Sequence, residues 1–156
     1  MSIVTKKKHA DPVSELMRRF EIVAGQTVAW GWLDGGPDPT APTIAAFNTF
    51  GTPNAKYPIP PRDTLTPTVQ AVASAVSEIT VAVGRAAGAG KSSAGLLEGL
   101  ALVIETEHQQ QIRAFSDPPN APATIAAKRF NDPLIGKGAG GRILAGARAE
   151  VRPAEG

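Results

Sequence analysis

The segment that decides the fold is residues 66–83, TPTVQAVASAVSEITVAV, in which valine or isoleucine recurs every three or four residues at positions 69, 72, 76, 79 and 83. This heptad-like spacing places one apolar stripe along a helix that begins at Thr66-Pro67. A second helix begins near Ser92 or Ser93. The short glycine-rich connection between the two predicts an antiparallel helical pair, and the alternative is one helix broken by an exposed loop. The apolar face of the second helix is formed by Leu96, Leu97, Leu100, Val103, Ile104, Ile112 and Phe115.

Shorter elements are predicted on the N-terminal side of this pair. Asp11 and Pro12 are typical of the N-cap and first turn of a short helix. In residues 21–33 the pattern changes, and larger apolar residues alternate with small ones. This alternation predicts a strand or hairpin with Trp30 and Trp32 on one face.

Three more short elements complete the pattern. Residues 43–51 predict one or two helical turns that end at Gly51. Residues 122–129 predict two further helical turns, and the weak alternation of residues 142–152 predicts a closing strand.

The composition excludes several classes of protein. The chain has 156 residues and no cysteine, which rules out disulfides, thiolate metal sites and cysteine nucleophiles. A net charge of +2 is too balanced to indicate a DNA-coating protein by charge alone. No stretch is long and apolar enough for a membrane helix, and we expect no secretory signal at the N-terminus because no apolar region follows its charged residues. We expect a protein of a cytosol-like compartment, with a flexible basic arm at residues 1–11 and a single structural domain at residues 12–156.

Two proline-rich stretches, residues 52–67 and 116–141, predict extended arms. Repeated proline rules out a helix interior or a central strand. Only 5% of the residues are aromatic, so we expect a thin core that is completed by subunit contacts. An arm that is already stiff loses little entropy on docking, which favours a subunit that clasps its neighbours. The alternative is a pair of ordinary long loops.

Residues 84–92, GRAAGAGKS, are similar to a phosphate-binding loop but lack its spacing. That loop requires a glycine where this chain has Arg85, and it follows a buried strand rather than a helical stripe. We expect instead a flexible loop between the two long helices. Its cations and those of the basic arm are candidates for facing DNA: Lys6, Lys7, Lys8, Arg85 and Lys91.

No set of residues supports catalysis. His108 is predicted to lie at the edge of the apolar face of the second long helix, and the other histidine, His9, is in the basic arm. The sequence has no metal-ligand cluster, no nucleophile elbow and no obvious acid–base pair. We therefore predict no enzymatic activity, no catalytic residues, no metal and no cofactor.

Two motifs resemble a known protein family. Residues 44–52, IAAFNTFGT, followed by Ile59-Pro60-Pro61-Arg62, resemble a signature of minor tail components and neck proteins of long-tailed bacteriophages. Residues 118–135, PPNAPATIAAKRFNDPLI, resemble the C-terminal signature of the same family, and the two motifs occur in the expected order. The chain departs from the family where residues 63–64 are Asp-Thr instead of Pro-Phe, and where residues 136–138 are Gly-Lys-Gly instead of Asp-Thr-Gly.

The resemblance implies an α+β fold in which a small, mainly antiparallel sheet packs on one or two long helices. It implies a structural subunit of the virion, in the neck, the head-to-tail connection or a tail-completion (tail-terminator) ring through which the genome passes. The expected location is the virion, assembled in the host cytoplasm. The alternative is a small nucleic-acid- or nucleotide-binding protein that uses residues 84–92 and the basic arm.

The partners expected from the resemblance are other copies in a homo-oligomeric ring and neighbouring neck, portal-adaptor or tail proteins. Non-specific contact with packaged DNA is expected, and contact with a membrane is not. The candidate subunit contacts are Phe47, Phe50, Ile59, Pro60, Pro61, Arg62, Pro119, Pro122, Ile125, Lys128, Arg129, Pro133, Leu134 and Ile135.

Overall fold

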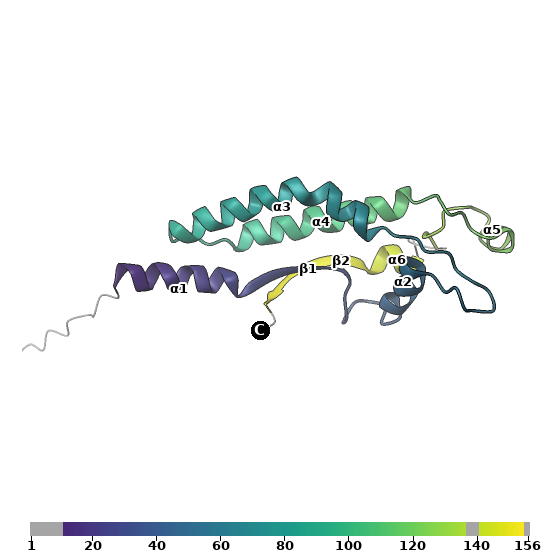
Figure 1. Ribbon diagram of the computed structural model, residues 1–156, viewed down its shortest axis with the longest axis horizontal. Coiled ribbons are helices and arrows are strands. Elements are labelled where there is room, and N and C mark those ends of the chain that lie inside the picture. The colour runs from purple at the N-terminus through teal and green to yellow at the C-terminus, as the bar shows by residue number, and fades with distance from the viewer. Residues whose placement is uncertain (1–10, 137–140, 155–156) are drawn as a thin grey trace, which may run out of the picture.

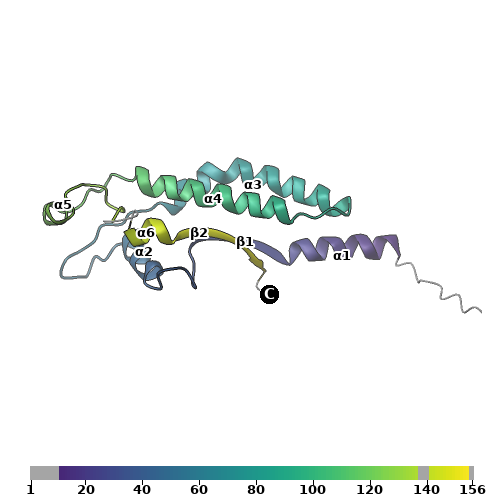
Figure 2. The ribbon, with the colours of Figure 1, turned by 180° about the vertical axis from the view of Figure 1, so that it is seen from behind.

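Two layers make up the protein in the computed structural model, which describes residues 11–136 and 141–154 (Figure 1). One layer is a hairpin of two long helices, and the other combines a two-stranded sheet with shorter helices, as the reverse view also shows (Figure 2). The α+β fold is thereby confirmed. In chain order the elements are α1 (Pro12–Ala24), β1 (Gln26–Trp32), α2 (Ala41–Phe50), α3 (Leu65–Gly88), α4 (Ala94–Ala114), α5 (Pro122–Lys128), α6 (Gly141–Gly146) and β2 (Ala147–Pro153).

The predicted antiparallel pair is the hairpin of α3 and α4, but the connection is shorter than the sequence suggested. Residues 84–88 form the last turn of α3, so the prediction of a flexible loop over residues 84–92 is wrong for its first half. Alanine and arginine in this stretch favour the helix. The chain reverses at Gly90, whose φ of 69° suits glycine, and the Lys91 N–H bonds the Ala86 carbonyl at 2.8 Å.

Helix α1 is longer than predicted, and the strand after it is shorter. Asp11 caps the helix through its carboxylate, which accepts a hydrogen bond from the Ser14 N–H at 3.2 Å. The helix continues to Ala24, so residues 21–24 are helical and not the predicted start of a strand. Gly25 ends it by donating its N–H to the Glu21 carbonyl at 2.9 Å.

The sheet is one antiparallel pair, with Gln26 opposite Pro153 and Trp32 opposite Ala147. The predicted closing strand is confirmed from Ala147 onward, whereas residues 142–146 belong to α6. Ile143 and Leu144 are consecutive and both buried, which a helical turn allows and a strand with alternating faces does not.

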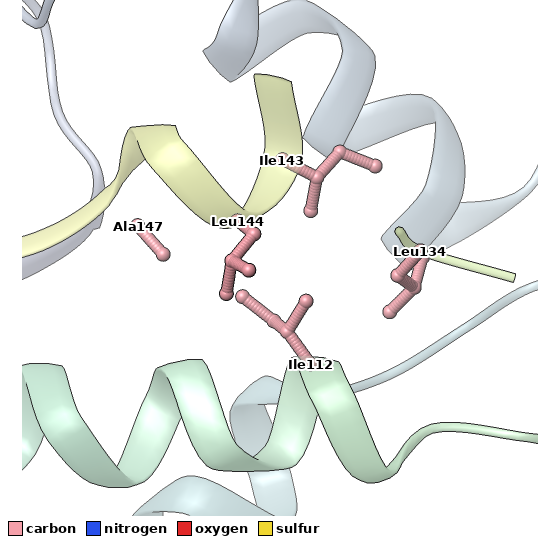
Figure 3. Close-up of a cluster of buried hydrophobic side chains, with 5 residues drawn as sticks. All are labelled: Ile112, Leu134, Ile143, Leu144 and Ala147. Carbon is pink, nitrogen blue, oxygen red and sulfur yellow. The ribbon is translucent and has the colours of Figure 1, made fainter. Parts of the chain in front are cut away.

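Two small hydrophobic clusters hold the layers together. The first joins α4, α6 and the segment before α6, and its side chains converge in Figure 3: Ile112, Leu134, Ile143, Leu144 and Ala147. The second is formed by Val72, Leu100 and Ile104, with Val28 and Trp30 packed against it. The apolar stripe of α3 is only partly covered, because Val69 and Val76 remain 53% and 37% exposed.

Candidate functional site

The two proline-rich segments meet in a cleft of about 620 Å³ at the end of the molecule that carries α2 and α5 (Figure 1). Residues from α2, from both proline-rich segments and from α6 line this cleft. It brings together eight of the candidate subunit contacts: Ile59, Pro60, Arg62, Pro119, Lys128, Pro133, Leu134 and Ile135.

The first proline-rich segment is folded back on the chain. Gly51 ends α2 with a φ of 74°, and the Thr52 N–H then bonds the Ile59 carbonyl at 2.9 Å. The Arg62 N–H bonds the carbonyl of Asn48 in α2 at 2.7 Å. The expected extended arm over residues 52–67 therefore packs on its own chain, where Arg62 and Thr64 are buried. The prediction that this arm reaches out to a neighbour does not describe the part around these two residues.

Arg62 is the central polar residue of the cleft. Its side chain is 8% exposed and donates to Asn48 Oδ1 at 3.0 Å and to the Pro119 carbonyl at 3.3 Å. Its buried Nε has no hydrogen-bond partner. Burial lowers the pKa of Arg62 below its ordinary value, although a guanidinium stays charged at neutral pH. No carboxylate in the described part of the chain forms an ion pair with it.

The second proline-rich segment closes on itself around α5. The Asn120 N–H bonds Asn131 Oδ1 at 3.1 Å, and the Asn120 side chain donates to the Asp132 carbonyl at 3.3 Å. Lys128 Nζ donates to that same carbonyl at 2.6 Å. Burial lowers the pKa of Lys128, the charge of Arg62 lowers it further, and the charge of Asp132 raises it. Both cations line the cleft.

Apolar side chains form most of the rest of the wall. Leu134 and Ile143 point toward Ile112 of α4 in Figure 3, and they also line the cleft. Leu134 is only 4% exposed and Pro133 is also buried, so both belong to the core of this chain rather than to an outer surface.

The other candidate contacts lie outside the cleft. Phe47 and Phe50 are 51% and 73% exposed on α2. Pro61, Pro122, Ile125 and Arg129 do not line the cleft, although they belong to the segments that form it. These residues stay predictions as subunit contacts.

The candidate DNA-facing residues are at the opposite end or outside the described chain. Arg85 and Lys91 are exposed near the turn between α3 and α4. Lys6, Lys7 and Lys8 lie outside the described residues, as do residues 137–140 of the second predicted arm.

His108 has a place that the sequence did not predict. It is 1% exposed and packs against Trp30 and Trp32 in two T-shaped ring pairs, at centroid distances of 5.2 and 4.7 Å. Its Nε2 is 3.3 Å from the Thr64 hydroxyl, and Nδ1 is buried without a partner. The prediction that both tryptophans share a face is confirmed. Their common neighbour is His108, which follows Trp32 by 76 residues and Trp30 by 78 residues in the sequence.

Comparisons with known proteins return nothing for this chain: no family model, no curated protein and no solved structure matches it. Within residues 11–136 and 141–154, no three His, Asp or Glu side chains are grouped as a metal site would require. None of the described helices is long and apolar enough to span a membrane.

Proposed function

We propose that the chain is a structural subunit of a bacteriophage virion, in the neck or tail-completion ring between the head and the tail. The observation that carries this proposal is the unburied apolar face of α1. Val13, Met17 and Phe20 lie on one face of this helix and are 66%, 56% and 43% exposed. Helix α1 has no buried residue at all.

The way in which α1 packs makes this exposure informative. The half-buried residues of α1 are Glu15, Arg19 and Val23, which are spaced by four and define the side turned toward the rest of the protein. The apolar face is therefore directed away from the chain's own core. An isolated helix of 13 residues with so little packing is marginal in water, so a neighbour that covers this face would stabilise it.

The sheet supports the same proposal. A two-stranded sheet is near the lower limit of stability, and within the described residues β1 pairs with β2 alone. Side chains of α4 occupy the outer edge of β2, where Glu105 accepts from the Ala149 N–H at 2.9 Å and Gln109 donates to the Ala147 carbonyl at 3.1 Å. A neighbouring copy could extend the sheet at β1 and cover α1 in one interface.

The proposal specifies the phage neck or tail because of the two motifs that resemble minor tail components. In this proposal other copies form the ring, and neck, portal-adaptor or tail proteins lie next to it. The exposed Arg85 and Lys91 give salt-dependent, non-specific contact with DNA that passes the ring. The chain acts through contacts in the virion and catalyses no reaction.

The assembly is tested by measuring the mass of the purified chain by light scattering over a range of concentrations. We expect a concentration-dependent oligomer that the double substitution Met17→Glu, Phe20→Glu dissociates. Ile22→Glu is the matched control, because Ile22 is 54% exposed on another side of the same helix and should leave the oligomer intact. A chain that stays monomeric at every concentration and binds DNA in low salt would favour the nucleic-acid-binding alternative instead.

The virion role is tested in particles. We expect the chain in purified virions by mass spectrometry, and we expect particles made without it to have heads and tails that do not join. Complete, infectious virions that lack the chain would refute the role.

A further inference from the structure

We propose that the cleft between the proline-rich segments binds a carboxylate carried by an extended segment of a neighbouring polypeptide. This inference names the chemistry of one partner of the proposed subunit. It relies on the proposed function only for the identity of the neighbour, because the binding of the carboxylate can be measured on the isolated chain.

Arg62 gives the first argument. A guanidinium has five N–H donors, and the contacts with Asn48 and Pro119 use two of them. A buried charge is costly unless an opposite charge and hydrogen bonds compensate it. Both of its acceptors here are neutral, and the described residues supply no carboxylate within ion-pair distance. The site therefore has one positive charge too many and lacks an anion.

Lys128 gives the second argument. It lines the same cleft and adds a second positive charge to it. The other charged side chain that lines the cleft, Arg142, is already paired with Asp38 at 3.1 Å. One carboxylate in the cleft would compensate the charge of Arg62, accept from its unpartnered Nε–H and accept from Lys128 as well.

The walls favour a carboxylate on a polypeptide over a phosphate. They are largely apolar, with Ile44, Ile59, Leu134, Ile135 and Ile143 around the two cations. Apolar walls would pack against the apolar residues that flank one acidic side chain in a bound polypeptide. A phosphate backbone would instead place repeated charge against these walls. The planar guanidinium also matches a carboxylate in two parallel hydrogen bonds.

The test is an NMR titration of the full chain labelled with ¹⁵N, in which the Nε–Hε signal of Arg62 is followed. The probes are N-acetylglutamate amide, its matched neutral control N-acetylglutamine amide, inorganic phosphate, and sodium chloride at equal ionic strength. We expect a saturable shift with the glutamate probe and only small, non-saturating shifts with the other three.

Variants of Lys128 make the test independent of folding defects at Arg62. Lys128→Gln should weaken binding of the glutamate probe by about fivefold, since it removes one partly exposed charge from the site. Lys128→Glu should abolish the binding, because it supplies a carboxylate from the chain itself. Lys91→Gln, which removes an equal charge at the far end of the molecule, should leave the affinity unchanged.

Three results would overturn the proposal. They are no saturable shift with the glutamate probe, equal affinity for the glutamate and glutamine probes, and tighter binding of phosphate than of the glutamate probe. None of these results depends on whether the chain forms a ring, so failure of the cleft and failure of the proposed function are distinguishable.

Discussion

His108 is held as a neutral side chain by its surroundings. Burial against Trp30 and Trp32 lowers its pKa from 6.5 to about 4. The unfolded chain therefore takes up a proton near pH 6.5, and the folded chain does so only near pH 4. Between pH 4 and pH 6.5 the unfolded state binds more protons than the folded state, so lowering the pH favours unfolding. The stability that neutral His108 contributes is fully present above pH 6.5.

We predict that the free energy of unfolding decreases by about 3 kcal/mol between pH 6.5 and pH 4 because of His108, at roughly 1.4 kcal/mol for each pH unit. Urea unfolding of the wild type and of His108→Gln at several pH values measures this. The variant should lose this part of the pH dependence, whatever its own stability. A histidine signal of His108 that titrates near pH 6.5 in the folded chain would contradict the prediction.

The cleft depends on Gly51, which ends α2 where the first proline-rich segment begins. A Cβ at this position would lie 2.8 Å from the Ile59 carbonyl oxygen and 3.0 Å from the Pro61 ring. Its φ of 74° is also unfavourable for any residue with a side chain.

Gly51→Ala should therefore cost about 2 kcal/mol of stability, because strain of this kind costs roughly 1–3 kcal/mol. Gly99→Ala is the control: it lies inside α4 with open space around its Cβ and should stabilise by about 0.5–1 kcal/mol. Chemical unfolding of both variants measures the difference. Equal effects in the two variants would show that the turn at Gly51 is not constrained.

At the scale of elements, α1 depends on its own cap more than on packing. It has no buried residue, so local interactions contribute a large share of its stability. Asp11→Ala removes the hydrogen bond to the Ser14 N–H and should cost the helix about 1 kcal/mol. Hydrogen exchange should become faster in α1 and stay unchanged in α4. Faster exchange throughout the chain would mean that α1 unfolds only together with the rest.

Periodicity in the sequence was enough to predict the two long helices, but not where the shorter elements begin and end. The spacing of valines identified α3, and its partner α4 followed from the same argument. The junctions were less predictable, because residues 21–24 and 142–146 carry apolar residues that suit either a helix or a strand. The cap at Gly25 and the burial of consecutive Ile143 and Leu144 decided them.

The polar parts of the site could not be predicted from local sequence. Arg62 finds Asn48 and Pro119 at separations of 14 and 57 residues, and His108 finds Thr64 at a separation of 44. The contacts of Arg62 with Pro119 and of His108 with Thr64 form only when the hairpin of α3 and α4 has closed. Most of the cleft residues lie in the two motifs that resemble phage tail components.

At the scale of the whole molecule, the first proline-rich segment is part of the fold. Deletion of residues 52–65 removes Arg62 and Thr64, which are buried at 8% and 1% exposure. We predict that this deletion abolishes the cooperative unfolding transition. Deletion of the exposed tip, residues 53–56, should leave the transition in place, and near-UV circular dichroism measures both. A folded chain after the longer deletion would show that the segment is a dispensable arm.

The two candidate contact surfaces of the molecule lie at different ends, alongside the helical hairpin. Helix α1, which carries exposed apolar residues, is at one end of the ribbon, and α5, which contributes residues to the cleft, is at the other (Figure 1). Helix α3 has 24 residues, which corresponds to a rod of about 36 Å. A neighbour bound at one end would leave the other end free, so in the proposed assembly one copy contacts two different neighbours at the same time.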